Sequence, residues 1–285
     1  MANARLYFIH ALAPLHPGTG QGTGVIDLPI AREKATGIPY LPGSSVKGSL
    51  RDSGLVSDTK RFFGPDVTAA DEHAGAAQFA DARLLLLPMR SLRGTFAWVT
   101  SPYLLRRASR DAAGLQADLP ADIPTPGNHQ QALLSGTALR YQNKQVILED
   151  LDLVGSASRE AQAWATWIGK HAFAEEPERQ LLNERLCVVH DDVLSFLLTT
   201  ATEVFARIRL QPDQKTVAEG ALWYEEALPA ETLLVGLILA QKIGSYTPSD
   251  VFTELKKLNG RSFQFGGKAT VGRGICRLQV AGGGQ

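Results

Sequence analysis

The chain has no apolar segment of membrane length, no paired cysteines and no net charge. No run of about 18 apolar residues occurs, and only Arg5 precedes the first strand-like stretch, which argues against a membrane span and a secretory leader. We therefore expect a cytoplasmic protein without a membrane partner. Cys187 and Cys276 lie far apart without a CxxC or Cys/His spacing, so we expect two buried thiols and neither a zinc motif nor a disulfide framework.

The zero net charge conceals an uneven distribution along the chain. Residues 82–110 contain six arginines and no acid, and residues 255–285 again contain six basic residues and no acid. Carboxylates gather instead between Glu175 and Glu226. Two interpretations remain open: either the basic stretches converge on a groove for a polyanion, or they form solvated faces that never meet.

Glycine is concentrated where few structures favour it. In HPGTGQGTGVIDLPIARE, residues 16–33, every second position from Gly18 to Gly24 is glycine, and the carboxylate of Asp27 follows. Such a segment makes a poor strand and a poor helix, but it lets one backbone approach another closely. A period of two is not the G-x-G-x-x-G of a dinucleotide site, and GSSVKGS at 43–49 places its lysine before the second glycine, unlike a P-loop.

Apolar periodicity and capping residues predict a mixed α and β chain. Strands are expected at 5–12 (with one buried face), 78–87, 95–100, 204–210, 262–265 and 275–280. Helices are expected from Ser44 or Ser45 to near Gly54, from Pro102 onward, and at 158–173, 191–201, 230–243 and 249–258. This order favours an α+β domain with an antiparallel sheet, and residues 114–136 are the best candidate for a mobile insertion or linker.

The expected helix after Pro42 has features of an anion site. Lys47 and Arg51 stand four residues apart and so share one face, next to the free N–H groups of a first turn that begins with Ser44 or Ser45. A phosphodiester backbone would suit this arrangement. The alternative is an exposed amphipathic helix whose basic residues are merely solvated.

Several motifs together resemble the RAMP superfamily of CRISPR proteins. The matching stretches are H-x-G-x-G…V-I-D-L-P-I-x-R-E at 16–33, T-G-x-P-Y-L-P-G-S-S-x-K-G-x-x-R at 36–51 and F-x-F-G-G-x-x-T-x-G-x-G at 263–274, with a further likeness over 190–231. More narrowly, the chain resembles the repeated backbone subunit of the type III-B (Cmr) RNA-guided effector complex. The type III-A backbone subunit shares P-G-S-S-x-K-G-x-x-R, and the I-D-L-P-I-x-R-E stretch favours III-B.

The resemblance implies a single RAMP domain over residues 1–285, with a modified ferredoxin-like (RRM-like) palm and inserted finger and thumb elements. The palm is expected at about 1–55, 78–110 and 200–285, the inserted helical and loop segments at about 111–199, and the thumb near 203–230. Several copies stack along a guide RNA, and each copy cuts the bound target RNA at regular intervals with an aspartate and a divalent metal. The implied partners are guide RNA, single-stranded target RNA, further copies of the chain and other subunits of the effector.

The resemblance also assigns candidate site residues. Asp27 matches the cutting aspartate, as ligand of Mg²⁺ or Mn²⁺ or as base, and no tightly bound cofactor is expected. His16 is a candidate to orient or donate a proton, and Glu225 and Tyr224 in YEEALP are further catalytic candidates. Contacts with the RNA backbone are expected from two groups of residues: Ser44, Ser45, Lys47 and Arg51 in the helix, and Gly266, Gly267, Lys268 and Arg273 in the terminal loop.

Two other functions fit the same motifs. A catalytically inert RNA-binding backbone subunit would share the fold but assign no chemistry to Asp27. A stand-alone endonuclease that processes repeat RNA would need a compact histidine-centred site and no stacking thumb. The cutting backbone subunit is the function that the four motifs in this order favour.

Overall fold

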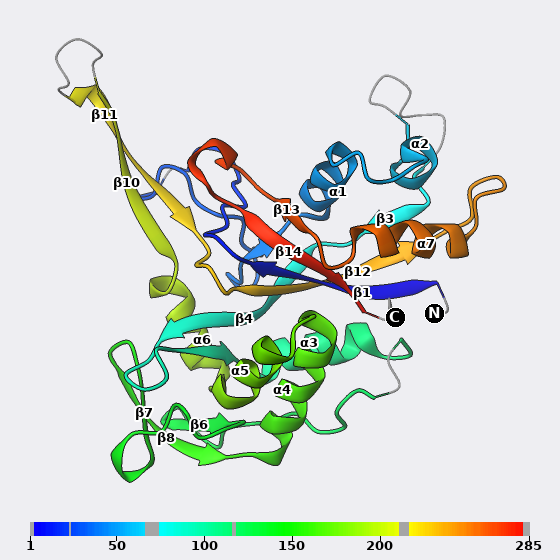
Figure 1. Cartoon of the computed structure of the whole chain (residues 1–285). Coiled ribbons are helices and arrows are strands. Elements are labelled where there is room, and N and C mark those ends of the chain that lie inside the picture. The colour runs from blue at the N-terminus through cyan, green and yellow to red at the C-terminus, as the bar shows by residue number, and fades with distance from the viewer. Residues whose placement is uncertain (1–2, 23, 66–73, 116–117, 211–216, 282–285) are drawn as a thin grey trace.

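One large mixed sheet runs through the molecule, and helices cover both of its faces (Figure 1). The computed structural model describes residues 3–22, 24–65, 74–115, 118–210 and 217–281. From one edge to the other, the described sheet contains β13 (Ser262–Gln264), β14 (Ile275–Val280), β1 (Ala4–Ala11), β12 (Leu233–Ala240), β4 (Ala82–Arg90), β5 (Phe96–Thr100), β9 (Leu186–Val188), β6 (Gln131–Leu134), β8 (Leu151–Ala157) and β7 (Gln145–Leu148). Two short strands join it at the side: β2 (Tyr40–Leu41) pairs with β4, and β3 (Ala77–Phe79) pairs with β12.

The helices occupy two layers. They are α1 (Gly43–Asp52), α2 (Thr59–Phe63), α3 (Pro102–Ala112), α4 (Arg159–Ala172), α5 (Glu176–Arg185), α6 (Asp191–Thr200) and α7 (Pro248–Leu258). Two 3₁₀ turns, η2 (Gln142–Lys144) and η3 (Ala269–Val271), complete the described regular structure. None of the described helices is long and apolar enough to cross a membrane.

The centre of the sheet has the ferredoxin-like arrangement. In chain order it consists of β1, α1, β4, β12, α7 and β14, and in space the four strands lie in the order β14-β1-β12-β4. Each neighbouring pair is antiparallel. This is the split β-α-β-β-α-β pattern, so the predicted α+β class and ferredoxin-like palm are confirmed.

Strand β1 is buried on both faces, although its sequence predicts only one buried face. Tyr7 and Ile9 pack into a core with α1 and α7, whereas Leu6 and Phe8 pack into a second core with α3 and α4. The alternating side chains of a strand point to opposite faces, so each face needs its own cover. The prediction was wrong because helices from distant parts of the chain cover the second face.

Strand β12 occupies a segment, 230–243, for which the sequence predicts a helix, and that prediction was also wrong. The run LLVGLILA is apolar throughout, and periodicity cannot distinguish a fully buried strand from a buried helix. The strand pairs with β1 on one side and β4 on the other. Gly236 lies against Tyr7, where a Cβ atom would come within 2.5 Å of the ring, so the glycine lets the strand pass an aromatic side chain.

Other expected elements are present with shifted ends or divided. The strand expected at 78–87 is two strands, β3 and β4, and the insertion expected at 114–136 contains β6, which pairs with β8 and β9. Trp164 Nε1 also donates to the Asp122 carbonyl at 2.8 Å, so this segment docks on α4. Both cysteines are free and buried, as expected, and burial raises the pKa of each thiol to about 12.

A two-stranded hairpin stands apart from the large sheet and projects from the body (Figure 1). It is formed by β10 (Glu203–Leu210) and β11 (Val217–Ala227), which pair antiparallel. Val204, Ile208 and Leu222 are each about half exposed on it. The thumb predicted near 203–230 falls on this hairpin.

Candidate active site

The glycine-rich segment after β1 lies against the hairpin strand β11. The Leu28 N–H donates to the Tyr224 carbonyl at 3.0 Å, and the Glu226 N–H donates to the Leu28 carbonyl at 3.0 Å. Asp27 Oδ2 accepts the Tyr224 N–H at 2.8 Å. These bonds hold the early aspartate on a strand that follows it by 197 residues in the chain.

An open cleft of about 460 Å³, which we call the Asp27 cleft, lies beside this contact. The residues that line it come from the glycine-rich segment, from β11 and from the C-terminal glycine loop: Gln21, Gly22, Asp27, Leu28, Leu222, Trp223 and Lys268. Asp27 is exposed. Within the described parts of the chain, its second carboxylate oxygen, Oδ1, accepts no hydrogen bond, so that oxygen is free to bind a cation or a proton.

Glu225 holds the Lys268 ammonium at this cleft. Lys268 Nζ lies 2.8 Å from Glu225 Oε1, Trp223 Nε1 donates to the same oxygen at 2.8 Å, and Arg207 Nε lies 3.4 Å from Oε2. Burial alone would raise the pKa of Glu225, but the hydrogen bonds from Lys268 and Trp223 and the nearby cations outweigh burial and hold that pKa below its usual 4.5. The geometry therefore gives Glu225 the role of an ionised partner that positions Lys268, while a direct catalytic role remains a prediction.

The neighbouring carboxylate, Glu226, fastens the base of the hairpin to the glycine-rich segment. Arg32 Nη2 donates to Glu226 Oε1 at 2.6 Å, the Ile30 N–H donates to Oε2 at 3.0 Å, and Thr202 Oγ1 donates to Oε1 at 2.8 Å. Glu226 is buried, and burial would raise its pKa. The Arg32, Ile30 and Thr202 hydrogen bonds outweigh that cost and lower the pKa instead.

His16 is buried behind the Asp27 segment. Its Nδ1 lies 2.6 Å from the Glu226 carbonyl oxygen, and because a carbonyl only accepts, Nδ1 carries the proton of that bond. A Cβ atom at Gly18 would come within 2.6 Å of Nε2, so the ring fills space that the glycine leaves open. The structure thus places His16 as a support of the loop, and proton transfer by it remains a prediction.

The C-terminal glycine loop between β13 and β14 reaches both strands of the hairpin. Lys268 contacts Glu225 on β11, and the Arg273 guanidinium lies 3.7 Å from the centre of the Phe205 ring on β10, a cation–π geometry. Lys268 itself has a left-handed φ of 67°, which costs a non-glycine residue about 1 kcal/mol. Lys268 is the lysine among the described residues that line the Asp27 cleft.

Gly266 and Gly267 bring this loop against His16. Gly266 has a φ of +70°, and a Cβ atom there would lie 2.5 Å from the His16 carbonyl oxygen. The Gly267 N–H donates to the same carbonyl at 2.9 Å. The C-terminal glycine loop therefore meets the backbone of segment 16–33 at His16, and Gly266 permits that close approach. The alternating glycines Gly18 to Gly24 take no part in this contact: Gly18 lies against the His16 ring, and a Cβ atom at Gly20 or Gly24 would meet nothing within 4 Å.

Helix α1 borders a second opening of about 440 Å³, which we call the Lys47 cleft. Ser44 and Lys47 line it, together with residues at the end of α2 and in β3. The predicted serine cap is wrong: α1 begins at Gly43 after Pro42, with no side-chain cap. The Gly43 N–H donates instead to Asp81 Oδ1 at 2.8 Å, so a carboxylate of the chain already occupies part of the predicted anion site.

Arg51 has a different environment from Lys47. Its guanidinium donates to the Gly64 carbonyl at 2.9 Å and to the Pro65 carbonyl at 3.3 Å, which ties α1 to the end of α2. Helix α1 also contacts β13, the strand that leads into the C-terminal glycine loop. The helix and the loop are therefore neighbours, but Lys47 and Lys268 line two separate clefts.

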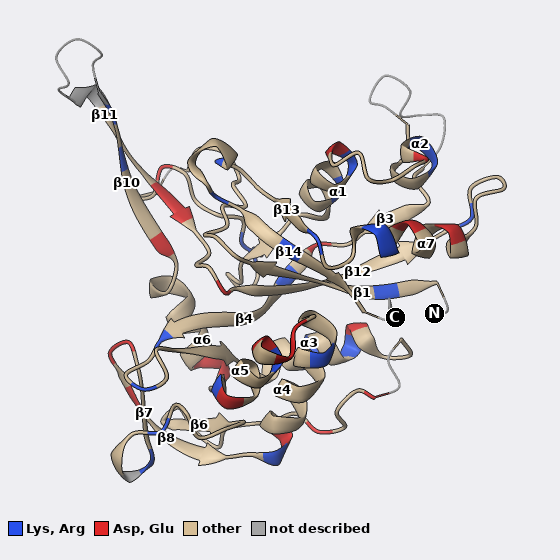
Figure 2. Ribbon diagram, viewed as in Figure 1, with Lys and Arg blue, Asp and Glu red and all other residues tan. Residues whose placement is uncertain are grey.

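The basic stretches of the sequence do not form one continuous groove. Strands β4 and β14, which carry parts of them, are separated by β1 and β12. Several helices, among them α4, α5 and α7, carry residues of both signs (Figure 2). Many of the cations are paired with acids distant in sequence, as in Arg83–Asp111, Arg107–Glu33, Arg106–Asp191 and Arg277–Glu178.

Sequence reasoning predicted two of the residues that line the Asp27 cleft, Asp27 and Lys268, but missed the residues that support them. Arg32 contacts Glu226 across 194 positions of the chain, and Thr202 contacts it across 24 positions. The available signal was a second carboxylate in YEEALP and an arginine in LPIARE, because charged side chains that enter a core need partners.

Comparison with known proteins extends these observations. The model of the RAMP superfamily matches residues 8–277. A CRISPR system Cmr endoribonuclease, Cmr4, of Pyrococcus furiosus is 34% identical over 97% of this chain and 95% of its own length. The crystal structure of oligomeric Cmr4 from the same organism superimposes with a TM-score of 0.76 at 27% identity, covering 98% of this chain and 97% of that one.

A third relative shares the fold at lower identity. The cryo-EM structure of a type III-B Cmr-beta complex bound to cognate target RNA contains a chain with a TM-score of 0.75 at 23% identity, covering 97% of this chain and 96% of that chain. The family match over most of the length, the near-full-length relative and the ferredoxin-like palm agree with one another. The chain belongs to the RAMP superfamily.

Proposed function

We propose that the chain is the guide-RNA-binding backbone subunit of a type III-B CRISPR effector, which stacks in several copies and cuts bound target RNA at regular intervals. The relative at 34% identity is a Cmr endoribonuclease, and the crystallised relative is oligomeric. The observation that carries the catalytic part is the exposed Asp27 carboxylate, held on the Tyr224 N–H in a cleft that it shares with Lys268.

The donor set of the Asp27 cleft fits a weakly held hard cation. Among the described residues, Asp27 belongs to no group of three His, Cys, Asp or Glu side chains with converging ligand atoms. Mg²⁺ and Mn²⁺ are commonly held by one or two carboxylates together with water and substrate phosphate oxygens. The free Asp27 oxygen can supply the carboxylate ligand of such a set. When bound, such an ion lowers the pKa of an attacking hydroxyl and stabilises negative charge on the phosphate.

Asp27 and Lys268 can position the groups of the RNA that take part in strand cleavage. A ribose 2′-hydroxyl must lie in line with the scissile bond, and a rigid carboxylate beside an open cleft orients the groups around it. Asp27 is fixed at one oxygen by the Tyr224 N–H, and its free oxygen accepts a proton or binds the metal. The Lys268 ammonium, held by Glu225, stabilises the charge that develops on the phosphate oxygens.

RNA binding is assigned to the two lysine-bearing surfaces and to the hairpin. In this proposal, Lys47 and Ser44 at the Lys47 cleft and Lys268 at the Asp27 cleft contact phosphates, and such contacts position a strand without reading its sequence. The projecting hairpin, with Val204, Ile208 and Leu222 exposed, fits a thumb that inserts apolar side chains between paired bases. Sequence specificity then comes from pairing between guide and target.

Replacing the free carboxylate tests the catalytic assignment. In the reconstituted effector with Mg²⁺, we expect Asp27→Asn to abolish target cutting, because the amide neither binds the metal well nor accepts a proton, whereas guide content and copy number stay as in the wild type. Asp150→Asn, an exposed carboxylate in the β7–β8 turn, is the matched control and should cut normally. Unchanged cutting by Asp27→Asn with intact assembly would show that Asp27 is not the catalytic group and would overturn this assignment.

A further inference from the structure

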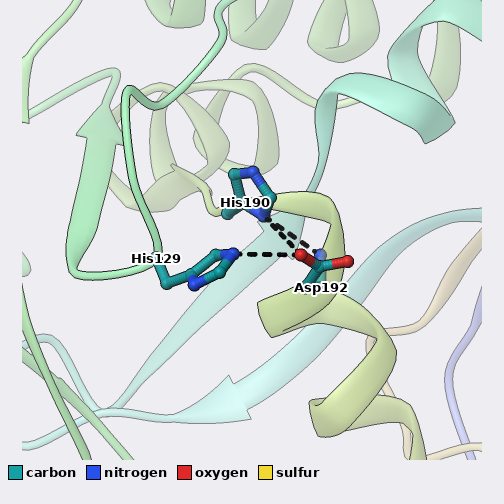
Figure 3. A group of neighbouring side chains, drawn as sticks. All are labelled: His129, His190 and Asp192. Carbon is teal, nitrogen blue, oxygen red and sulfur yellow. Dashed lines mark hydrogen bonds and ion pairs between the residues drawn. The ribbon is translucent and has the colours of Figure 1, made fainter.

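A second cluster of ligating side chains lies where the loop before β6 meets α6, and it shares no residue with the Asp27 cleft (Figure 3). His129 comes from the loop before β6, whereas His190 and Asp192 stand at the N-terminus of α6. Of the residues that the structure describes, only these three bring three His, Cys, Asp or Glu ligand atoms within 4.8 Å of one another.

The three ligand atoms have nearly the spacing of a metal site. Asp192 Oδ2 lies 3.0 Å from His129 Nε2 and 3.4 Å from His190 Nδ1. Zinc binds imidazole nitrogen and carboxylate oxygen at about 2.0–2.2 Å, and two such ligands of a tetrahedral ion are roughly 3.3 Å apart. Small side-chain rotations are therefore enough to bring all three atoms to one ion.

The contacts of His190 Nδ1 with Asp192 are those expected where a cation could be shared. The Asp192 backbone N–H donates to His190 Nδ1 at 3.2 Å, which requires a lone pair and no proton on that nitrogen. The 3.4 Å approach of Nδ1 to Asp192 Oδ2 is then a contact between two acceptors with no hydrogen between them. A cation shared by Nδ1 and Oδ2 would remove this contact between two acceptors. Because Nδ1 has a single lone pair, binding of the ion would replace the hydrogen bond from the Asp192 N–H.

We propose that His129, His190 and Asp192 bind a divalent transition-metal ion, with Zn²⁺ as the expected occupant. Two imidazoles and one carboxylate suit zinc and its neighbours in the transition series, whereas Mg²⁺ and Ca²⁺ prefer sets made only of oxygen. Three protein ligands leave a fourth position for water or for a group from another molecule. The site is thus distinct in chemistry from the hard-cation site assigned to Asp27.

The position of the cluster defines what the ion does. It joins the loop before β6 to α6, and α6 ends at Thr200, three residues before β10 of the hairpin begins at Glu203. The ion therefore fastens the loop before β6 to the helix that leads into the hairpin. The His129 and Asp192 side chains are 64% and 76% exposed, so a dissolved ion reaches them without any opening of the fold.

Zinc titration of the full, untagged chain, freed of metal with a chelator and free of RNA, tests the site by calorimetry. We expect one equivalent to bind to the wild type, and we expect His129→Ala and Asp192→Asn each to weaken binding at least tenfold, since even losses in the outer shell of a metal site cost about 10–100-fold. Co²⁺ should give the visible absorption of a tetrahedral N/O site in the wild type and lose it in both variants.

Two controls separate this site from other binding. His171→Ala removes a histidine that also lies beside a carboxylate, Asp118, but leaves the cluster intact, so it should bind zinc as the wild type does. Asp27→Asn should also bind normally, which keeps this result independent of the proposed function. Zinc binding that survives in His129→Ala and Asp192→Asn, or that is lost in Asp27→Asn alone, would overturn the proposal.

Discussion

Glu226 shows how one buried carboxylate can hold two distant segments together. It lies 3% exposed between Arg32 and Thr202, and it accepts the Ile30 N–H from the segment that carries Asp27. A buried charge is tolerated only with such partners, and removal of one partner leaves the others unsatisfied. The position of Asp27 therefore depends on a residue that does not line the Asp27 cleft.

The pKa of Glu226 predicts a pH-dependent effect of Glu226→Gln. Because folding lowers this pKa below 4.5, the ionised carboxylate contributes stability above about pH 4.5 and loses it as the pH falls through the folded-state value. We expect Glu226→Gln to reduce the free energy of unfolding by about 2 kcal/mol at pH 7, measured by urea unfolding. The difference from the wild type should shrink as the pH falls from 5 toward roughly 3.

An exposed carboxylate supplies the control for this measurement. Glu175→Gln should follow the wild-type curve at every pH, because Glu175 lies at the surface before α5. A deficit in Glu226→Gln that stays constant over this pH range would mean that its cause is lost packing and not the charge of Glu226.

At the scale of elements, the C-terminal glycine loop is the structure that brings Lys268 to the Asp27 cleft. Its glycines differ in what surrounds them. Gly266 and Gly272 have almost the same left-handed φ, +70° and +76°, but a Cβ atom at Gly266 would meet the His16 carbonyl oxygen at 2.5 Å, and one at Gly272 would meet nothing within 4 Å. A comparison of alanine substitutions at Gly266 and Gly272 therefore distinguishes the cost of backbone strain from the cost of a close contact.

We expect alanine at these two positions to have unequal effects. Gly272→Ala should lower the free energy of unfolding by about 1 kcal/mol, the cost of a left-handed alanine. Gly266→Ala should cost about 1–3 kcal/mol more, because the methyl group also displaces the His16 backbone. Urea unfolding of the two variants beside the wild type gives both numbers. Equal losses would show that Gly266 serves the turn alone and that the loop need not lie close to His16.

Elements with local signals were well predicted from the sequence. Helix α4 begins after Ser158, whose hydroxyl accepts the Ala161 N–H, and α7 begins with a capping box of Thr247 and Asp250. Strand β12 was mistaken for a helix because its strand character comes from pairing with β1 and β4. Pairing between segments far apart in sequence leaves no periodic signal in a fully apolar run.

The same division holds for the candidate site. Motifs placed Asp27 and Lys268 in the site, and the structure brings both to one cleft. The sequence did not reveal that Asp81 accepts the first N–H of α1, or that Arg51 donates to carbonyls at the end of α2. These contacts depend on how separate elements pack, so the anion site expected from α1 alone was too simple.

At the scale of the whole molecule, the charge distribution limits how RNA can bind. The net charge is zero, and several arginines of the basic stretches are paired with acids, which reduces their attraction for a polyanion. Affinity must then come from a few local contacts and from repetition along a strand, since stacked copies multiply a weak individual interaction. A backbone subunit that binds as an array needs no more than this from each copy.

Salt dependence measures these local contacts directly. For guide-length single-stranded RNA and the purified chain, we expect Lys47→Ala to weaken binding equally for two unrelated sequences and to reduce the slope of log affinity against log salt concentration by about 0.7, the contribution of one phosphate contact. Lys170→Ala, which removes one positive charge from α4 on the opposite face of the sheet, should leave both the affinity and the slope unchanged. Fluorescence anisotropy at four or more salt concentrations gives both quantities.

Equal effects of the two substitutions would mean that RNA responds only to total charge, and an unchanged slope in Lys47→Ala would remove α1 from the RNA-binding surface.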